Sequence, residues 1–357
     1  MNRLYLDHAA TTPLHPEAVE AMARAFEVWA NPSSPHAEGR ASRAVLEAGR
    51  KTIADVLGWR HDVILTSGAS ESIAIAAKAA TPERRLVGAT EHEVVPAAMG
   101  EGAIVLPVDA DGLIDMDALD AALDGQPALV AIQQVNNETG VIQPMPAIAE
   151  RVRAAGSLLL ADCAQGAGKL ALPDADFIAV AAHKLGGPPG VGALLVRDLA
   201  TLRASGGQEK GYRRGTQAVP AVAGFAAALK AHAFADAMPR LTELRSRLEG
   251  ELGQAGGVIV AANAPRIAGI GAIAMPGVTS ASQLVQFDLA GIAISAGSAC
   301  SSGSMKASRV LAAMGVESSL AECVIRVSFG PSTSEADIDR FIAEWRRIAS
   351  RAASKAA

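Results

Sequence analysis

The chain has 357 residues and a net charge of −5, and half of its residues are hydrophobic while only 3% are aromatic. This length allows a large core and about two domains, and the lack of a basic run in the sequence argues against nucleic acid as a partner. The three cysteines, at 163, 300 and 323, have no paired spacing, so we expect free thiols in a reducing, cytoplasmic compartment. The N-terminus lacks the apolar stretch of a signal peptide, and the sequence contains no run long enough to predict a membrane span.

Short apolar runs alternate with helical periodicity from residue 64 to residue 182. Strands are predicted at 64–67, 86–89, 103–108, 129–133, 158–161 and 177–182, and helices at 71–80, 116–123 and 145–154. This alternation is typical of βαβ units, so we expect an α/β fold with a mainly parallel sheet.

The pattern changes after residue 215. An Ala-rich helical region is predicted from 217 to about 253, with an interruption at Pro239. Shorter strands follow near 258–262, 270–275, 292–295 and 324–327, and a last helix begins at Ser334. We therefore expect a smaller α+β domain here, which the first residues of the chain join.

Two of the apolar runs end in groups that suit one kind of chemistry. Asp162 follows the run 158–161, and Lys184 follows the run 177–182. Ligands of open α/β sheets bind beyond the carboxyl ends of the strands, so we expect both groups in one crevice. A lysine held against an apolar wall has a lowered pKa and forms a Schiff base with pyridoxal 5′-phosphate (PLP), whose ring nitrogen needs an acid such as Asp162. The alternative is a solvated loop lysine, but the Gly- and Pro-rich turn at 186–190 favours a rigid ligand site.

Other turns after predicted strands carry groups that suit a cofactor, each with a plainer alternative. Ala69 and Ser70 begin a helix whose N–H groups can bind a phosphate, or Ser70 simply caps that helix. His92 can stack on a pyridine ring or serve as a capping or core residue. Asn137 can bond a ring substituent or belong to a plain turn, and Gln165 can reach the phenolic oxygen of the cofactor.

Three further features indicate anion or sulfur chemistry. The basic, Gly-rich segment 205–216 is either a solvated surface or a source of Thr216 for a phosphate. Cys300 lies among small residues in a predicted exposed loop and is the better candidate for a reactive thiol, whereas Cys163 is expected to be a small buried hydrophobe. Arg326 lies inside an apolar strand, and a buried arginine requires an anion, which is either a substrate carboxylate or an acidic side chain.

With these residues in view, the chain resembles the cysteine desulfurases of the NifS/IscS type, which are PLP-dependent enzymes of the class V aminotransferase family. The resemblance is carried, in family order over nearly the whole chain, by YLDHAATT (5–12), NPSSPHAEGR (31–40), TSGASES (66–72), TEH (90–92), NNETG (136–140), ADCAQGAGK (161–169), HKLGGPPGVGAL (183–194), GGQEKGYRRGTQ (206–217), GSACSSGS (297–304) and RVSFG (326–330).

This resemblance implies a PLP-dependent transferase of fold type I. A large PLP-binding domain, 15–250, would hold a mainly parallel seven-stranded sheet, and a small α+β domain, 1–14 and 251–357, would carry the Cys300 loop. The implied reaction converts L-cysteine to L-alanine and transfers the sulfur to Cys300 as a persulfide, for Fe–S cluster assembly or other thiol acceptors. The implied partners are a sulfur-acceptor or Fe–S scaffold protein and a second copy of the chain in a homodimer. The alternatives are a selenocysteine lyase or other class V enzyme, or a catalytically weak sulfur-relay protein.

The resemblance also implies a role for each matching position. Lys184 would bind PLP covalently and move the Cα proton, Asp162 would pair with the ring nitrogen, and His92 would stack on the ring. The remaining implied contacts are Asn137 and Gln165 on the O3′ side, and Ala69, Ser70, His183 and, from the second subunit, Thr216 on the phosphate. Arg326 would bind the substrate carboxylate, with Asn137 beside the substrate.

Cys300 would attack the substrate sulfur, and it is also the residue implied to ligate a nascent Fe–S cluster; no resident metal is implied. Two positions depart from the family pattern, Ala181 where a Ser is usual and Ala74 where an Asn is common. The loss of one hydroxyl contact predicts weaker PLP binding by about 1 kcal/mol.

Overall fold

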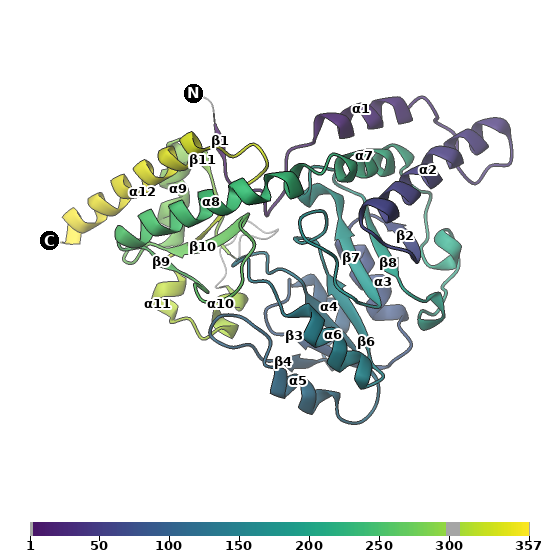
Figure 1. Cartoon of the computed structure of the whole chain (residues 1–357), viewed down its shortest axis with the longest axis horizontal. Coiled ribbons are helices and arrows are strands. Elements are labelled where there is room, and N and C mark those ends of the chain that lie inside the picture. The colour runs from purple at the N-terminus through teal and green to yellow at the C-terminus, as the bar shows by residue number, and fades with distance from the viewer. Residues whose placement is uncertain (1–2, 298–307, 357) are drawn as a thin grey trace.

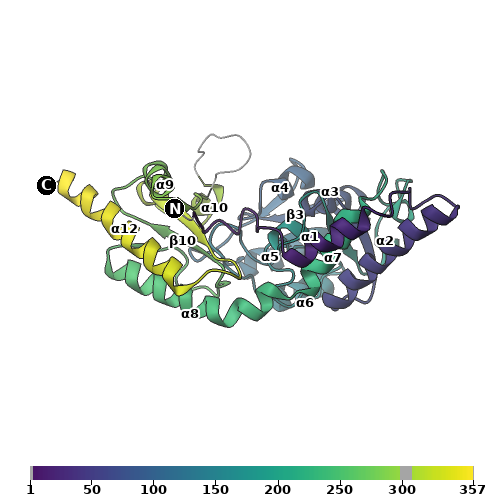
Figure 2. The same cartoon turned by 90° about the horizontal axis from the view of Figure 1, so that it is seen from above.

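The computed structural model describes residues 3–297 and 308–356. Figures 1 and 2 show an elongated molecule with two groups of elements, a large sheet with its helices at one end and the C-terminal elements at the other. The long helix α8 (Ala233–Gln254) runs from the first group into the second.

A seven-stranded sheet forms the centre of the first group. Its strand order is β2 (Asp62–Thr66), β8 (Gly192–Val196), β7 (Phe177–Ala181), β6 (Leu158–Asp162), β5 (Ala128–Gln133), β3 (Arg84–Gly88) and β4 (Ile104–Leu106). Within these seven strands β8 alone runs antiparallel to its neighbours, and the other pairs are parallel. The predicted α/β fold with a mainly parallel seven-stranded sheet is therefore confirmed.

Helices cover both faces of this sheet, because successive residues of a strand point to opposite sides. Leu65, Val130 and Ile178 belong to the core on one face. The helices that contribute to this core are α2 (Ala37–Val56), α5 (Met116–Leu123), α6 (Met145–Ala154) and α7 (Val219–Lys230), and α1 (Pro16–Ala25) packs on α7. Leu129 and Phe177 point to the opposite face, where α3 (Ala69–Ala79) and α4 (Val94–Met99) cover them. The result is a three-layer sandwich.

The second group contains an antiparallel sheet and a separate apolar cluster. The sheet has the order β12 (Val324–Ser328), β10 (Ile270–Ala274), β9 (Val258–Ile259), and β1 (Leu4–Tyr5) pairs in parallel with β11 (Ile292–Ala293). The helices of this group, besides α8, are α9 (Ser280–Leu289), α10 (Arg309–Ala313), α11 (Ser318–Ala321) and α12 (Glu335–Ala356). The rings of Phe287 on α9 and Phe341 on α12 are stacked, with centroids 4.8 Å apart, so aromatic contact joins these two helices.

The apolar side chains of the two groups of elements form separate clusters. Leu4 and Leu6 pack in the cluster of the second group, as expected if the N-terminus joins the small domain. Along α8, Phe234 packs with the large sheet, whereas Leu241 and Leu248 pack with the second group. The boundary at residues 250 and 251 remains a prediction.

The helical region 217–253 is divided elsewhere than predicted. Helix α7 ends at Lys230, and His232 adopts a left-handed backbone with φ of 50°, which ends a run of right-handed helix. Pro239, the predicted interruption, lies inside α8 instead. It is tolerated there because Ala235, whose carbonyl loses its partner, is exposed to water.

Several elements have no counterpart in the sequence-based prediction. These are the helices α1, α2 and α4 and the antiparallel strand β8. The predicted strands 103–108 and 258–262 are present but shorter, as β4 and β9. None of the helices in residues 3–297 and 308–356 combines the length and the apolar character needed to cross a membrane.

We predict that Gly192→Ala destabilises the protein. A Cβ atom at 192 would lie 2.3 Å from the carbonyl oxygen of Val180 and 2.7 Å from Cα of Gly68, so backbone would have to move. The expected loss is about 1–3 kcal/mol in the free energy of unfolding, measured by denaturant titration.

Gly250→Ala is the matched control, because a Cβ atom at this exposed position in α8 would meet nothing within 4 Å. Alanine there should stabilise the helix by about 0.5–1 kcal/mol. Equal effects of the two substitutions would contradict the close packing of Gly192.

Candidate active site

A cavity of about 470 Å³ opens at the carboxyl edge of the large sheet. The ends of β5, β6 and β7 meet there because these strands are parallel. The start of α3, the N-terminal segment and β12 complete the walls. The predicted site residues that line the cavity are Ala69, Ser70, His92, Asn137, Asp162, Gln165, His183, Lys184 and Arg326.

Lys184 ends the short 3-10 helix η1 (Ala182–Lys184), directly after β7. Its Nζ atom donates hydrogen bonds to the carbonyl oxygens of Ala9, at 2.7 Å, and Ala10, at 2.8 Å. The amine thus meets two backbone carbonyls instead of the apolar wall expected from the sequence. Gly186, with φ of 91°, turns the chain directly after the amine in a conformation that glycine adopts without strain.

Asp162 is the last residue of β6, and its side chain is buried at the same edge. Its Oδ1 atom accepts a hydrogen bond of 2.9 Å from the backbone N–H of Ala164. Burial raises the pKa of the carboxyl, while this hydrogen bond and the charges of His92 and Lys184 oppose the rise. A cationic ligand group at this position would further favour the ionised form.

The start of α3 faces the cavity with its first backbone N–H groups, which have no partner inside a helix. Gly68 is the N-cap, with φ of 154°, and Ser70 lies within the first turn, so the expectation that Ser70 caps the helix is wrong. The turn is held by the side chain of Thr66, which donates to the carbonyl of Gly68 at 3.1 Å. Because Gly192 has no side chain, β8 packs directly against this turn. The helix N-terminus is thereby held at the cavity, where its N–H groups are suitable donors for an anion.

His92, Asn137 and Gln165 reach the cavity from three different loops. The Nδ1 atom of His92 accepts from the backbone N–H of Val94 at 3.4 Å, so a local contact orients the ring. The turn at 136–140 is made by Asn136, and Asn137 is the residue of this turn that lines the cavity. Gln165 donates through Nε2 to the carbonyl of Ala9 at 2.8 Å. Its buried Oε1 atom has no partner among the described atoms, so a ligand can use it.

Arg326 lies on β12 with its side chain buried and facing the cavity. One guanidinium nitrogen forms an ion pair of 2.9 Å with Asp7, and another donates to the carbonyl of Asn137 at 3.0 Å. The acidic partner considered from the sequence is thus Asp7. The Nε atom is buried without a partner among the described atoms, which leaves donor capacity for an anion.

Further basic groups lie near Lys184, and two of them, Lys169 and His8, were not singled out from the sequence. The ammonium group of Lys169 lies 4.5 Å from the centre of the Phe234 ring, and burial together with the charge of Lys184 lowers the pKa of Lys169 to about 7. Burial and the same lysines lower the pKa of His183 to about 4, and burial and Lys169 lower that of His8 to about 4. These shifts indicate a cavity in which positive charge is disfavoured until an anion enters.

Two predicted site residues are not brought into this cavity. Thr216 lines a different hollow of about 410 Å³, together with Trp29. Cys300 lies outside the described residues. Of the two departures from the family pattern, Ala181 lines the cavity and Ala74 is an exposed residue of α3.

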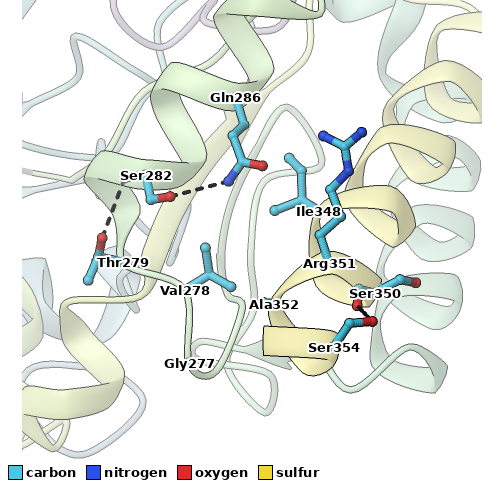
Figure 3. A pocket seen from close by; sticks show the side chains of 10 residues that line it. All are labelled: Gly277, Val278, Thr279, Ser282, Gln286, Ile348, Ser350, Arg351, Ala352 and Ser354. Carbon is cyan, nitrogen blue, oxygen red and sulfur yellow. Dashed lines mark hydrogen bonds between the residues drawn. The ribbon is translucent and has the colours of Figure 1, made fainter. Parts of the chain in front are cut away.

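A larger hollow, about 990 Å³, lies between α9 and the end of α12 (Figure 3). Its polar side chains largely bond one another or nearby backbone, as Gln286 does with Ser282 at 3.2 Å. Among the lining residues that the structure describes, Arg351 alone is charged, and no acid accompanies it there. The described part of this lining holds no pair of acid and base groups, whereas the cavity at the sheet edge does.

The mainly parallel sheet and the polar cavity at its carboxyl edge define a ligand-binding enzyme of the α/β class. The profile of the family Aminotransferase class-V matches residues 4–341, and the chain belongs to this family. Enzymes of this family are generally PLP-dependent.

Curated relatives and solved structures agree with this assignment. An IscS-like cysteine desulfurase of Mycobacterium tuberculosis (strain ATCC 25618 / H37Rv) is 39% identical over 94% of this chain and 93% of that protein. A cysteine desulfurase of Cereibacter sphaeroides is 36% identical over 96% and 94%. A NifS-like protein from Rickettsia africae ESF-5 superposes with a TM-score of 0.87 at 29% identity, covering 97% and 99% of the two chains. SspA in complex with cysteine superposes with a TM-score of 0.77 at 27% identity, covering 93% and 100%. These relatives confirm the predicted resemblance to NifS/IscS-type cysteine desulfurases.

We predict that His8 makes the stability of the protein depend on pH in the acidic range. Its pKa is about 4 in the folded chain and 6.5 in its ordinary state, so between these values only the unfolded chain takes up the proton. The free energy of unfolding should therefore fall as the pH drops from 6.5 to 4. In His8→Gln this fall should be less steep by up to about 1.4 kcal/mol per pH unit, measured by denaturant titration at several pH values.

The same substitution at the exposed His61 serves as the control. Parallel stability curves for His8→Gln and the unmodified chain would contradict the lowered pKa of His8.

Proposed function

We propose that this chain is a cytoplasmic, PLP-dependent cysteine desulfurase that converts L-cysteine to L-alanine and receives the sulfur on Cys300 as a persulfide. The observation that carries the proposal is the convergence of Lys184, Asp162 and the N-terminus of α3 on one cavity. An amine, an acid and an anion site are the three groups that PLP requires of a protein.

The residues present fit PLP. Lys184 is the amine for covalent attachment, Asp162 is the carboxylate for the ring nitrogen, and His92 is the ring that stacks. The backbone N–H groups of Ala69 and Ser70 supply donors for the phosphate, with His183 beside them. The orphaned Oε1 atom of Gln165 offers an acceptor on the O3′ side, together with Asn137. When bound, the cofactor supplies an electron sink for bonds at the substrate Cα.

Arg326 is proposed to bind the carboxylate of L-cysteine. Its guanidinium group is fixed by Asp7 and by the carbonyl of Asn137, so a substrate meets an already oriented donor. The guanidinium group lines the cavity and retains donor capacity for the substrate carboxylate. This contact places the substrate on the side of the cavity where Lys184 can take up and return the Cα proton.

Cys300 is proposed to complete the reaction as a thiolate. Its sulfur attacks the sulfur of the substrate, so that an S–S bond forms and the C–S bond breaks. The electron pair of the broken bond stays with the substrate carbon, which gains a proton and becomes the methyl group of L-alanine. The persulfide on Cys300 then passes its outer sulfur to a thiol acceptor or an Fe–S scaffold protein.

A homodimer is part of this proposal, because Thr216 lies away from the cavity of its own chain. It lies instead beside Phe26 and Trp29, and the side chain of Trp29 is 81% exposed. Large exposed aromatic residues are typical of protein interfaces. A second copy packed on this surface would bring its Thr216 to the phosphate site of the first.

We predict that single-turnover reaction with L-cysteine forms one alanine per active site and a persulfide on Cys300, detected by mass spectrometry of the Cys300 peptide. Cys300→Ala should keep the visible absorbance of the bound cofactor and form no persulfide. The controls are Cys163→Ala and Cys323→Ala, since both of these thiols are buried and should not take part. Alanine and sulfide released by Cys300→Ala at the unmodified rate would contradict the mechanism.

We also predict that Trp29→Glu dissociates the homodimer and weakens retention of PLP, since a buried charge would oppose the interface. Sedimentation velocity and the absorbance of the bound cofactor measure the two effects. Leu289→Glu is the matched control, because Leu289 is 83% exposed and ends α9, a helix of the second group of elements. A Trp29→Glu protein that stays dimeric would show that the interface lies elsewhere.

A further inference from the structure

The turn at 136–140 contacts both points where the segment containing Cys300 joins the described part of the chain. These points are Gly297 and Ser308, and both lie against the side chain of Glu138. The proposed desulfurase mechanism leaves this carboxyl group without a role. Resting on that proposed function, we propose that Glu138 is a positioning residue that fixes the two ends of the Cys300 segment beside the substrate anchor.

Glu138 is presented by a rigid turn. The Oδ1 atom of Asn136 accepts from the backbone N–H groups of Glu138, at 2.9 Å, and Thr139, at 2.8 Å. Gly140 closes the turn with φ of 79°, and its N–H donates to the carbonyl of Asn136 at 3.0 Å. The backbone that carries the carboxylate is therefore held in place before any ligand binds.

Ser308 holds the far end of the segment. Its hydroxyl oxygen accepts from the backbone N–H of Leu311 at 3.1 Å, as the N-cap of α10. The same hydroxyl donates to Oε2 of Glu138 at 2.6 Å, a distance typical of a charge-assisted hydrogen bond. Helix α10 and Glu138 together therefore fix the position of Ser308, the first described residue after the segment that contains Cys300.

Gly297 holds the near end by close packing. A Cβ atom at 297 would lie 2.1 Å from Oε2 of Glu138 and 2.9 Å from its Cδ, so any larger residue there would displace the carboxyl group. Two residues earlier, the backbone of Ser295 pairs with that of Arg326 through hydrogen bonds of 3.2 and 2.7 Å. The near end is thus attached to the strand that carries the substrate anchor.

The charge of Glu138 connects these contacts with the site. Glu138 is 9% exposed, and burial raises its pKa, while the hydroxyl of Ser308 and the charge of Arg326 act in the opposite direction. The neighbouring carbonyl of Asn137 accepts from Arg326 at 3.0 Å. One turn therefore contacts the guanidinium group that awaits the substrate carboxylate and both ends of the segment that contains the thiol.

The test compares Glu138→Ala, Glu138→Gln and Ser308→Ala in the PLP-loaded protein. We expect Glu138→Ala to slow persulfide formation in a single turnover by about 10- to 100-fold, since misplacing a reacting group by about 1 Å has effects of this size. Glu138→Gln keeps an oxygen acceptor for Ser308 and should lie between Glu138→Ala and the unmodified protein. The effects of Glu138→Ala and Ser308→Ala should be less than additive, because both remove the same contact.

Two further readouts separate positioning from other roles. Binding of L-cysteine, followed through the cofactor absorbance, should be unchanged, and the rate of Cys300 alkylation by iodoacetamide should change in parallel with persulfide formation. Glu322→Ala, at an exposed acid near α11, is the control and should match the unmodified protein in every readout.

Unmodified rates of persulfide formation and alkylation in Glu138→Ala would overturn the inference. An equal loss of cysteine binding would also overturn it, because Glu138 would then act on the substrate anchor. If the unmodified protein forms neither alanine nor persulfide, the proposed function itself fails, and the alkylation rates still report whether Glu138 fixes the segment.

Discussion

The hydrogen bonds from the ammonium group of Lys184 to the carbonyls of Ala9 and Ala10 are the contact on which the site depends. They join residues that are about 175 positions apart in the sequence. The N-terminal segment reaches this point from β1, which belongs to the second group of elements. The amine is therefore placed by both groups at once, and Gln165 fixes the same segment through Ala9. Loss of this segment would leave the carboxyl edge of the sheet open.

The electrostatics of the cavity follow from this arrangement. Lys169 and His183 have lowered pKa values because they are buried near Lys184, and His8 has one because it is buried near Lys169. Asp162 has a raised pKa because it is buried on the same edge of the sheet. A cationic ring nitrogen beside Asp162 would oppose the raised pKa of this carboxyl. An anionic phosphate at the N-terminus of α3 would oppose the lowered pKa values of the basic groups.

The sequence predicts those parts of the site that follow buried strands. Asp162 and Lys184 were predictable, since apolar runs that end in polar groups share one edge of a parallel sheet. The carbonyls of Ala9 and Ala10 were not, because backbone acceptors have no signature in a sequence. Strand β8 begins with Gly192, which the close packing of Val180 and Gly68 requires. Because glycine is also typical of turns, the sequence alone does not distinguish the start of this strand from a turn. Only tertiary packing reveals that Thr216 lies outside the cavity of its own chain.

PLP is proposed to attach at Lys184, and the nearby Lys169 is the alternative amine against which this attachment can be tested. Both lysines are close to the same cavity. With a pKa of about 7, Lys169 is deprotonated more easily than an ordinary lysine. Reduction of the PLP-loaded protein with borohydride, followed by peptide mapping, identifies the attached residue. Attachment at Lys184 predicts the pyridoxyl group on the peptide that contains this residue, and none on Lys169. A pyridoxyl group on Lys169, or one that persists in Lys184→Ala, would contradict it.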